Sequence, residues 1–200
     1  MNGLRLENLS FLGRGPYTFA VEPGQVLGLH GASGAGKSLL LRAIADLEPH
    51  EGHLCLDQTA CNEISGPHWR RQVAYLPAES FWWHERVGQH FRVPPEASWL
   101  QKLGFTSEVM DWEINRLSTG EKQRLAIFRL LQNRPKALLL DEPTASLDQG
   151  SISRVENFIL DYLKENSAPA IWVSHDPVQL KRVASRRFEI LVGGEMRELA

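Results

Sequence analysis

Gly31-Ala32-Ser33-Gly34-Ala35-Gly36-Lys37-Ser38 fits the phosphate-binding pattern G-x-x-x-x-G-K-[ST] at every specified position. The short apolar run at residues 25–30 precedes this loop and indicates a buried strand, and good helix formers follow it at residues 39–47. Strand, glycine-rich loop and helix is the order that the motif needs. The sequence therefore predicts a binding site for a nucleoside triphosphate.

Each residue of this loop is a candidate for nucleotide binding: Gly31, Ala32, Ser33, Gly34, Ala35, Gly36, Lys37 and Ser38. Glycines let backbone N–H groups turn inward around phosphates, and the next helix points its positive end at the same anions. We expect the Lys37 ammonium to reach the β- and γ-phosphates and the Ser38 hydroxyl to ligate Mg²⁺. The alternative is a glycine-rich turn that binds nothing, against which the flanking strand and helix argue.

Length and composition limit the classes of protein to consider. The 200 residues suffice for one domain with a buried core, and the formal net charge of −2 argues against a general nucleic-acid binder. Cys55 and Cys61 have neither metal-ligand partners nor a repeated pattern, so packing or a reduced cytosolic setting explains them more simply than a disulfide. No secretion signal or membrane-spanning run is evident, so we expect any membrane role to come through a partner.

The remaining chain alternates between strand and helix patterns. Alternating residues at 4–9 and 17–22 predict two half-buried antiparallel strands joined by a turn at 13–16. Further strands are expected at 53–57 (an edge strand), 72–77, 137–142, 170–174 and 187–192, the last closing the sheet before a polar turn. This alternation predicts an α/β fold with a largely parallel sheet.

Seven aromatic residues crowd into residues 81–116, among charges and the Pro94-Pro95 break: Phe81, Trp82, Trp83, Phe91, Trp99, Phe105 and Trp112. We interpret this stretch as a small helical lobe inserted into the α/β body. Stacking on nucleic-acid bases is one alternative, which the charge of the lobe disfavours. Packing of the lobe explains most of these rings, and exposed ones could serve a protein partner.

Two carboxylates, Asp141 and Glu142, end a fully apolar strand, which is where α/β sheets place ligands. We expect Asp141 to hold Mg²⁺, directly or through water, and Glu142 to orient or deprotonate the attacking water. His175 follows another buried strand and is expected to donate to the γ-phosphate. The alternatives are a helix-cap or solvated role for the carboxylates and an ordinary polar strand end for the histidine.

The segment at residues 117–124 is one that a generic phosphate-loop enzyme would not need. Ser118 and Glu121 have the S-x-x-E spacing of a capping box, which predicts a helix start and could be the whole explanation. Ser118 and Gly120 at a bare helix start also make a second anion site. Two such sites suggest that each nucleotide is bound by both.

This ordered set, residues 31–38, 117–121, 141–142, 146–148 and 175, resembles the ATP-binding-cassette ATPases over essentially the whole chain. The resemblance implies one cassette domain (1–200) with a mostly parallel central sheet, an N-terminal antiparallel β subdomain and a helical subdomain at about 81–133. It implies a homodimer that holds two ATP, with Mg²⁺, between the phosphate loop of one copy and the Leu117–Glu121 signature of the other. Asp148 would then lie in the loop that communicates across the dimer.

The same resemblance implies an ATPase that powers a membrane permease from the cytoplasmic face of the cell membrane, with no nucleic-acid partner. Residues 118–124, 131–132, 135–136 and 172–176 look most like the ATP-binding subunit of small bacterial iron-efflux transporters, so iron or another metal is the implied cargo. A soluble cassette ATPase acting on nucleic acid or ribosomes is the second hypothesis. A regulatory module without turnover is the third, although the presence of Glu142 and His175 argues against it.

The chain departs from the family pattern at several positions. Ala78, followed by Glu79, stands where a glutamine usually contacts Mg²⁺ and senses the membrane partner, and we expect Glu79 or a water to replace part of that role. Thr119 replaces the commoner glycine of the signature and Glu121 the commoner glutamine. The aromatic residue that stacks on adenine falls near Gly13, which leaves Phe11 or Tyr17 as substitutes: the base-binding residue is therefore open.

Overall fold

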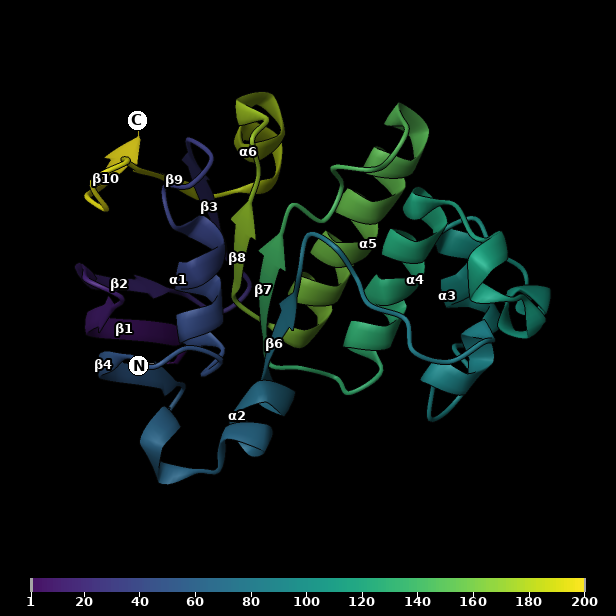
Figure 1. Ribbon diagram of the computed structural model, residues 1–200, viewed down its shortest axis with the longest axis horizontal. Helices are drawn as coiled ribbons and strands as arrows, with labels where there is room; N and C mark the ends of the chain where they lie inside the picture. Colours follow the sequence, from purple (N-terminus) through teal and green to yellow (C-terminus); the bar gives the residue numbers. More distant parts are fainter. Residues whose placement is uncertain (1, 200) are drawn as a thin grey trace.

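A computed structural model describes residues 2–199, in which ten strands form two sheets (Figure 1). The smaller sheet is antiparallel, with the order β2-β1-β4-β5. Its strands are β1 (Leu4–Phe11), β2 (Arg14–Val21), β4 (Glu51–Leu56) and β5 (Thr59–Ala60). The two N-terminal strands are confirmed. The turn between them is shorter than expected, and β4 is not an edge strand because β5 pairs with it.

The larger sheet has the order β10-β9-β3-β8-β7-β6. Its strands are β3 (Val26–Gly31), β6 (Val73–Leu76), β7 (Ala137–Asp141), β8 (Ala170–Val173), β9 (Arg186–Ile190) and β10 (Met196–Leu199). All neighbouring pairs are parallel except β9 and β10. The mostly parallel sheet is confirmed. The expected closing strand β9 is not the edge, because the polar residues 196–199 add β10 beyond it.

Helices cover the larger sheet and extend beyond it. They are α1 (Lys37–Ile44), α2 (Gly66–Gln72), α3 (Ala97–Lys102), α4 (Thr119–Leu131), α5 (Gln149–Asn166) and α6 (Pro177–Val183). Four short 3₁₀ turns are η1 (Cys61–Glu63), η2 (Val87–His90), η3 (Ser107–Asp111) and η4 (Ile114–Arg116). No helix in the described part of the chain is both long and apolar enough to cross a membrane.

Successive residues of the central strands pack into two different hydrophobic cores. Leu138 and Leu140 of β7 face a core shared with α4 and α5, whereas Leu139 faces a core shared with α1 and the smaller sheet. Side chains of a strand alternate between faces, so a strand covered on both faces is apolar throughout. That is why β7 is a continuous apolar run rather than an alternating one.

The aromatic stretch at residues 81–116 lies at the end of the molecule opposite the smaller sheet (Figure 1). It contains α3 and three 3₁₀ turns, and its buried residues join the same core as α4 and α5. Phe105 is buried in that core, and Trp82, Phe91, Trp99 and Trp112 pack against it. Phe81 and Trp83 are 76% and 65% exposed, so packing explains five of the seven rings.

Candidate active site

The carboxyl ends of β3, β8 and β7 lie side by side at one edge of the larger sheet. The ends of β7 and β8, the segments that follow these three strands, and the segment after β6 line a cleft of about 330 Å³, whose residues are Ser33, Gly34, Gly36, Lys37, Ser38, Leu39, Ala78, Asp141, Glu142, Val173 and His175. Parallel strands bring their carboxyl ends to the same edge, where α/β sheets bind ligands. The fold thus brings the phosphate loop, both predicted carboxylates and His175 into one cleft.

Two glycines of the loop have backbone conformations that other residues rarely adopt. Gly31 has a φ of 145° and Gly36 a φ of 101°. A side chain at Gly31 would also collide with the Ile190 carbonyl oxygen, and a Cβ at Gly36 would lie 3.0 Å from the Arg14 guanidinium carbon. Glycine is therefore needed at both positions for the loop to curve around an anion.

The Lys37 ammonium is held inside the loop that it is predicted to serve. The residue is 6% exposed, and its Nζ donates to the carbonyl oxygens of Gly31 and Ala32 at 2.8 and 2.9 Å. Burial lowers the pKa of Lys37, and the nearby carboxylates Glu142 and Asp141 oppose that shift. A buried cation with only carbonyl partners has capacity left for an anion, so the loop fits a phosphate group.

Asp141 is the last residue of β7, and 3% of it is exposed. Its Oδ2 accepts a 3.1 Å hydrogen bond from the Tyr75 hydroxyl. A buried carboxylate with one neutral donor keeps lone pairs for a cation, and Mg²⁺ prefers oxygen ligands. With Ser38 lining the same cleft, the donor set fits Mg²⁺.

Glu142 has a strongly perturbed carboxyl group. Its backbone is left-handed (φ 49°), and its N–H donates to the Val173 carbonyl, 3.1 Å away. Burial first, and then the charge of Asp141, raises the pKa of Glu142 to about 7, while Lys37 lowers it. Its buried Oε1 has no hydrogen-bond partner among the described residues. A carboxyl group that titrates near neutral pH and has a free acceptor atom is suited to take a proton from water.

His175 lies beside this carboxylate. Its Nε2 is 3.5 Å from Glu142 Oε1, and 54% of its side chain is exposed. Burial, followed by the charge of Lys37, lowers the pKa of His175. The imidazole is therefore neutral near pH 7, when one ring nitrogen donates and the other accepts.

Ser118, Gly120 and Asp148 do not line this cleft in the described chain. The capping box is confirmed: Ser118 Oγ accepts from the Glu121 N–H, and the Glu121 carboxylate accepts from the Ser118 N–H at 2.9 Å. Gly120 packs against the Ser146 carbonyl, where a Cβ would lie 3.0 Å away. Asp148 caps α5 through Ser151. These three residues lie on a surface separate from the cleft of their own chain.

Arg14 is a residue of this region that sequence reasoning missed. Its Nη1 donates to the Ala35 carbonyl at 2.6 Å and its Nη2 to the Gly34 carbonyl at 3.3 Å. The sequence signal is absent because Arg14 precedes the loop by about twenty residues and no motif links them. Arg14 holds the outer side of the loop in place.

The positions of Phe11 and Tyr17 do not suit stacking on a base, and the position of Glu79 does not suit contact with Mg²⁺. Phe11 and Tyr17 are each 3% exposed, and the Tyr17 hydroxyl donates to the Gly194 carbonyl, so neither ring offers a free face to a base. Ala78 lines the cleft, whereas the exposed Glu79 does not. The Ala78 methyl group therefore faces the cleft, and the Glu79 carboxylate, which was expected to supply an oxygen there, does not line it.

Comparisons with known proteins agree with this geometry. A family model described as "ABC transporter" matches residues 15–145. The "Probable iron export ATP-binding protein FetA" of Escherichia coli (strain K12) is 30% identical over 190 residues, which cover 86% of this chain and 84% of that protein. The "Lipoprotein-releasing system ATP-binding protein LolD 1" of Rhodospirillum rubrum is 34% identical over 185 residues, covering 82% and 80%.

A third relative is the "Phosphate import ATP-binding protein PstB" of Aeropyrum pernix, 30% identical over 194 residues that cover 84% of this chain and 77% of that protein. Among solved structures, "Structure of ATP binding subunit of ABC transporter" has a TM-score of 0.83 at 23% identity and covers 99% of this chain and 90% of that chain. At that identity, the structural match concerns the fold.

Proposed function

The chain belongs to the ABC transporter family as an ATP-binding subunit and ATPase, and we propose that the transporter it powers exports iron or another metal ion. The similarity to an iron-export relative supports this cargo. The other relatives named above release lipoproteins or import phosphate, so the cargo needs its own test. We also propose that residues 1–200 form one cassette domain with a helical subdomain at about 81–133.

The observation that supports hydrolysis in the cleft is the Oε1 atom of Glu142, which is buried and has no hydrogen-bond partner among the described residues. We propose that this carboxylate accepts a proton from the attacking water, because its pKa of about 7 leaves it partly ionised at neutral pH. Lys37 balances the phosphate charge, with the backbone N–H groups of the loop. His175, 3.5 Å from Glu142, would donate to the γ-phosphate.

Ser38 and Asp141 are proposed as the ligands of Mg²⁺, directly or through water. Bound there, the ion would neutralise charge on the phosphates during transfer. The Tyr75 hydroxyl, which donates to Asp141, would orient that carboxylate toward the cleft.

We propose that two copies of the chain pair head to tail in the ATP-bound state. The position of Ser118, Gly120 and Asp148 away from the cleft of their own chain supports this arrangement. A two-fold axis would bring the α4 start of each copy to the nucleotide bound by the other. In the free chain the Glu121 carboxylate occupies the Ser118 donors, so it would have to release them on pairing.

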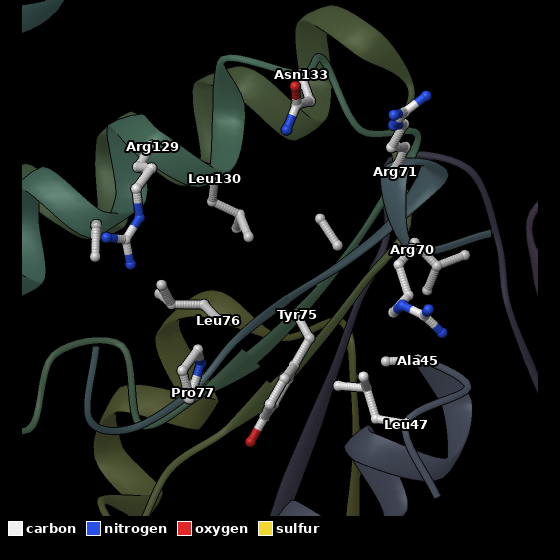
Figure 2. Close-up of a pocket in the computed structure, with 13 residues that line it drawn as sticks. Ala45, Leu47, Arg70, Arg71, Tyr75, Leu76, Pro77, Arg129, Leu130 and Asn133 are labelled. Carbon is white, nitrogen blue, oxygen red and sulfur yellow. The ribbon is translucent and has the colours of Figure 1, made fainter. Parts of the chain in front are cut away.

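A membrane permease is the proposed partner, and a groove of about 250 Å³ is its proposed docking site. The groove lies among the end of α1, α2, β6 and α4 (Figure 2). Its surface combines apolar groups with cations, and it is lined in part by Leu47, Leu76, Leu130, Arg70, Arg71 and Arg129. This pattern suits a short amphipathic helix with acidic residues. Docking there would place the chain at the cytoplasmic face of the membrane.

Phosphate release from Mg-ATP by the purified chain tests the active site, with Lys37→Ala expected to abolish turnover and markedly weaken ATP binding. Unchanged ATP affinity and hydrolysis in this variant would contradict the site.

Cargo and partner need a second experiment. The chain is co-expressed with its permease, and ATP-driven iron uptake into inverted membrane vesicles is measured, with Lys37→Ala as the control. Uptake that depends on Lys37 supports metal export. Co-purification with ribosomes or DNA instead of a permease would support the soluble-ATPase alternative.

A further inference from the structure

A second cluster of chemistry-bearing side chains lies at the end of α1 opposite the phosphate loop. One potential ligand atom each from Asp46, His50 and Cys61 lies within 4.8 Å of the others. Asp46 and His50 follow the C-terminal end of α1, and Cys61 begins η1. None of the three lines the cleft that holds Lys37. The cluster is therefore separate from the active site.

Local hydrogen bonds orient the His50 ring and fix the Asp46 backbone. His50 Nδ1 is 3.1 Å from the Glu48 carbonyl oxygen, and donation to that carbonyl leaves Nε2 with a free lone pair. A backbone carbonyl on the other ring nitrogen is the usual arrangement for a metal-bound histidine. Asp46 has a left-handed backbone (φ 55°), and its N–H donates to the Ala43 carbonyl at the helix end. These bonds fix the Asp46 backbone at the end of α1 and the His50 ring on the segment that follows it.

We propose that Asp46, His50 and Cys61 bind a single divalent cation of the Zn²⁺ class. One carboxylate, one imidazole and one thiolate form a donor set that suits Zn²⁺, with water as the fourth ligand. Zinc–ligand bonds of about 2.0–2.3 Å place neighbouring ligand atoms roughly 3.3–3.8 Å apart in a tetrahedron. The cluster needs side-chain shifts on the order of 1 Å to reach that geometry.

A reactive cysteine is the main alternative for Cys61, and its surroundings argue against it. Burial, together with the nearby Asp46 carboxylate, raises the pKa of the Cys61 thiol to about 11, which Arg70 only partly offsets. Reactive cysteines instead have lowered pKa values in positively charged, accessible surroundings. Cys61 also packs against the core shared by α1 and the smaller sheet.

Arg70 is the group that competes with a cation at this cluster. Its Nη1 donates to the Asp46 carbonyl oxygen at 2.8 Å and lies 3.3 Å from Asp46 Oδ2. The two side chains are 36% and 35% exposed, and partly exposed pairs of this kind contribute little stability. A bound cation would therefore take over the carboxylate from Arg70.

Displacement of Arg70 would change the lining of the neighbouring groove, of which Arg70 is a part. Figure 2 shows the Arg70 guanidinium beside Ala45 and Leu47 in the lining of that groove. A cation on the Asp46 carboxylate would leave the Arg70 guanidinium bonded to the Asp46 carbonyl oxygen alone, so that its charge could pair with an acidic group of the docked partner. This consequence, unlike the metal site itself, rests on the permease docking proposed above.

The test is a metal titration of the purified full chain after chelation. Zn²⁺ affinity is measured by competition with a chromogenic chelator, and Co²⁺ reports thiolate ligation through its charge-transfer absorption. The wild-type chain should bind one equivalent and show the cobalt–thiolate band. Because no cysteine lines the nucleotide cleft, the band distinguishes the two places where a divalent cation could bind.

Variants make the test specific to these ligands. Cys61→Ser should abolish the band, and His50→Gln should weaken Zn²⁺ binding by more than the roughly 10- to 100-fold that follows loss of a second-shell partner. Arg70→Gln should tighten binding, because the competing cation is removed. Cys55→Ser and His53→Gln, which replace a neighbouring cysteine and an exposed histidine of β4, are matched controls that should retain binding.

Circular dichroism and ATP binding check that each variant folds. Absence of saturable Zn²⁺ binding to the wild-type chain would overturn the proposal. So would Zn²⁺ binding that survives both Cys61→Ser and His50→Gln, or a cobalt band that depends on Cys55 instead of Cys61.

Discussion

The Tyr75 hydroxyl donates a 3.1 Å hydrogen bond to Asp141 Oδ2, and the Tyr75 side chain also lines the groove of about 250 Å³ between α1, α2, β6 and α4. Figure 2 shows the ring crossing the groove with its hydroxyl directed away from Asn133. The contact follows from the register of β6 and β7, in which Tyr75 pairs with Leu139, two residues before Asp141. One side chain therefore connects the proposed permease groove to the proposed magnesium ligand.

Tyr75→Phe should weaken the apparent affinity for Mg²⁺ and have a smaller effect on the ATPase rate at saturating Mg²⁺. The reason is that the substitution removes the donor that orients Asp141. Burial, and then the charge of Asp141, raises the pKa of Tyr75 far above neutral, so the hydroxyl remains a donor at working pH. We expect a several-fold higher Mg²⁺ concentration for half-maximal ATPase activity, in line with a loss on the order of 1 kcal/mol.

Tyr162→Phe is the matched control for this measurement. It also removes a tyrosine hydrogen bond, a 2.7 Å bond to the Pro135 carbonyl that lies away from the cleft. It should lower the free energy of unfolding and leave the Mg²⁺ dependence unchanged. An equal effect of both variants on Mg²⁺ dependence would refute a specific role for Tyr75.

Glu142→Gln should bind Mg-ATP, hydrolyse it very slowly and accumulate as a dimer. The substitution keeps the size of the side chain and removes the group that accepts the proton from water. Light scattering with Mg-ATP measures the dimer, and adding Ser118→Arg to this variant should block pairing by filling the α4 start. A Glu142→Gln chain that stays monomeric at high concentration, with and without its permease, would contradict the sandwich arrangement.

The pH profile of kcat/KM should fall on the acid side of about pH 7, where Glu142 becomes protonated and cannot accept a proton. Steady-state phosphate release between pH 5.5 and 9, roughly the range that brackets this pKa, measures this acid limb of the kcat/KM profile. His175→Gln should lower the rate and keep the limb, since the pKa of His175 is lowered instead. A limb that disappears in His175→Gln would assign the titration to the histidine.

The same raised pKa makes Glu142 a source of instability at neutral pH. A carboxyl group with a raised folded-state pKa binds more protons in the folded than in the unfolded state between about pH 4.5 and 7, so stability falls as pH rises through that window. Glu142→Gln should therefore stabilise the apo chain at pH 8 by up to about 3 kcal/mol, with the difference vanishing near pH 4. Urea unfolding of both chains at the two pH values gives the difference in free energy of unfolding between the variant and the wild type. A difference at pH 8 that is no larger than the difference at pH 4 would contradict this prediction.

Arg14→Ala should weaken ATP binding, because the guanidinium no longer holds the carbonyls of Gly34 and Ala35. Arg14 is partly exposed, so we expect a loss on the order of 1 kcal/mol, or about five-fold in Kd for ATP. Arg197→Ala, which removes an exposed ion pair with Glu189, is the control and should leave ATP affinity unchanged. Equal ATP affinity of the Arg14→Ala and wild-type chains would show that the loop needs no such support.

Much of the site could be predicted because its determinants are contiguous in the chain. The glycine spacing of residues 31–38 encodes the loop locally, and the apolar run before Asp141 indicates a strand buried on both faces. The capping box at Ser118 needs only four residues to specify a helix start, and the structure contains it. Such local patterns act through backbone conformation and side-chain period, which the sequence displays directly.

The short edge strand and the base-binding residue illustrate where local patterns fail. Residues 196–199 show no strong strand pattern, and they become β10 only because β9 offers them a free edge. Tyr17 and Phe11 are aromatic in the right part of the chain, yet the core shared with α1 buries both rings. Burial of an individual side chain depends on the elements that pack over it.

The sequence by itself thus determined the phosphate loop, the parallel sheet, the carboxylates of Asp141 and Glu142 at the carboxyl end of β7 and the capped start of α4. Only the tertiary structure decided that Arg14 supports the loop, that Tyr75 reaches Asp141 and that potential ligand atoms of Cys61, Asp46 and His50 lie within 4.8 Å of one another. Each of these arrangements joins different segments at separations that no motif defines. Their geometry follows from strand order, register and helix packing, because these place side chains from distant segments against one another.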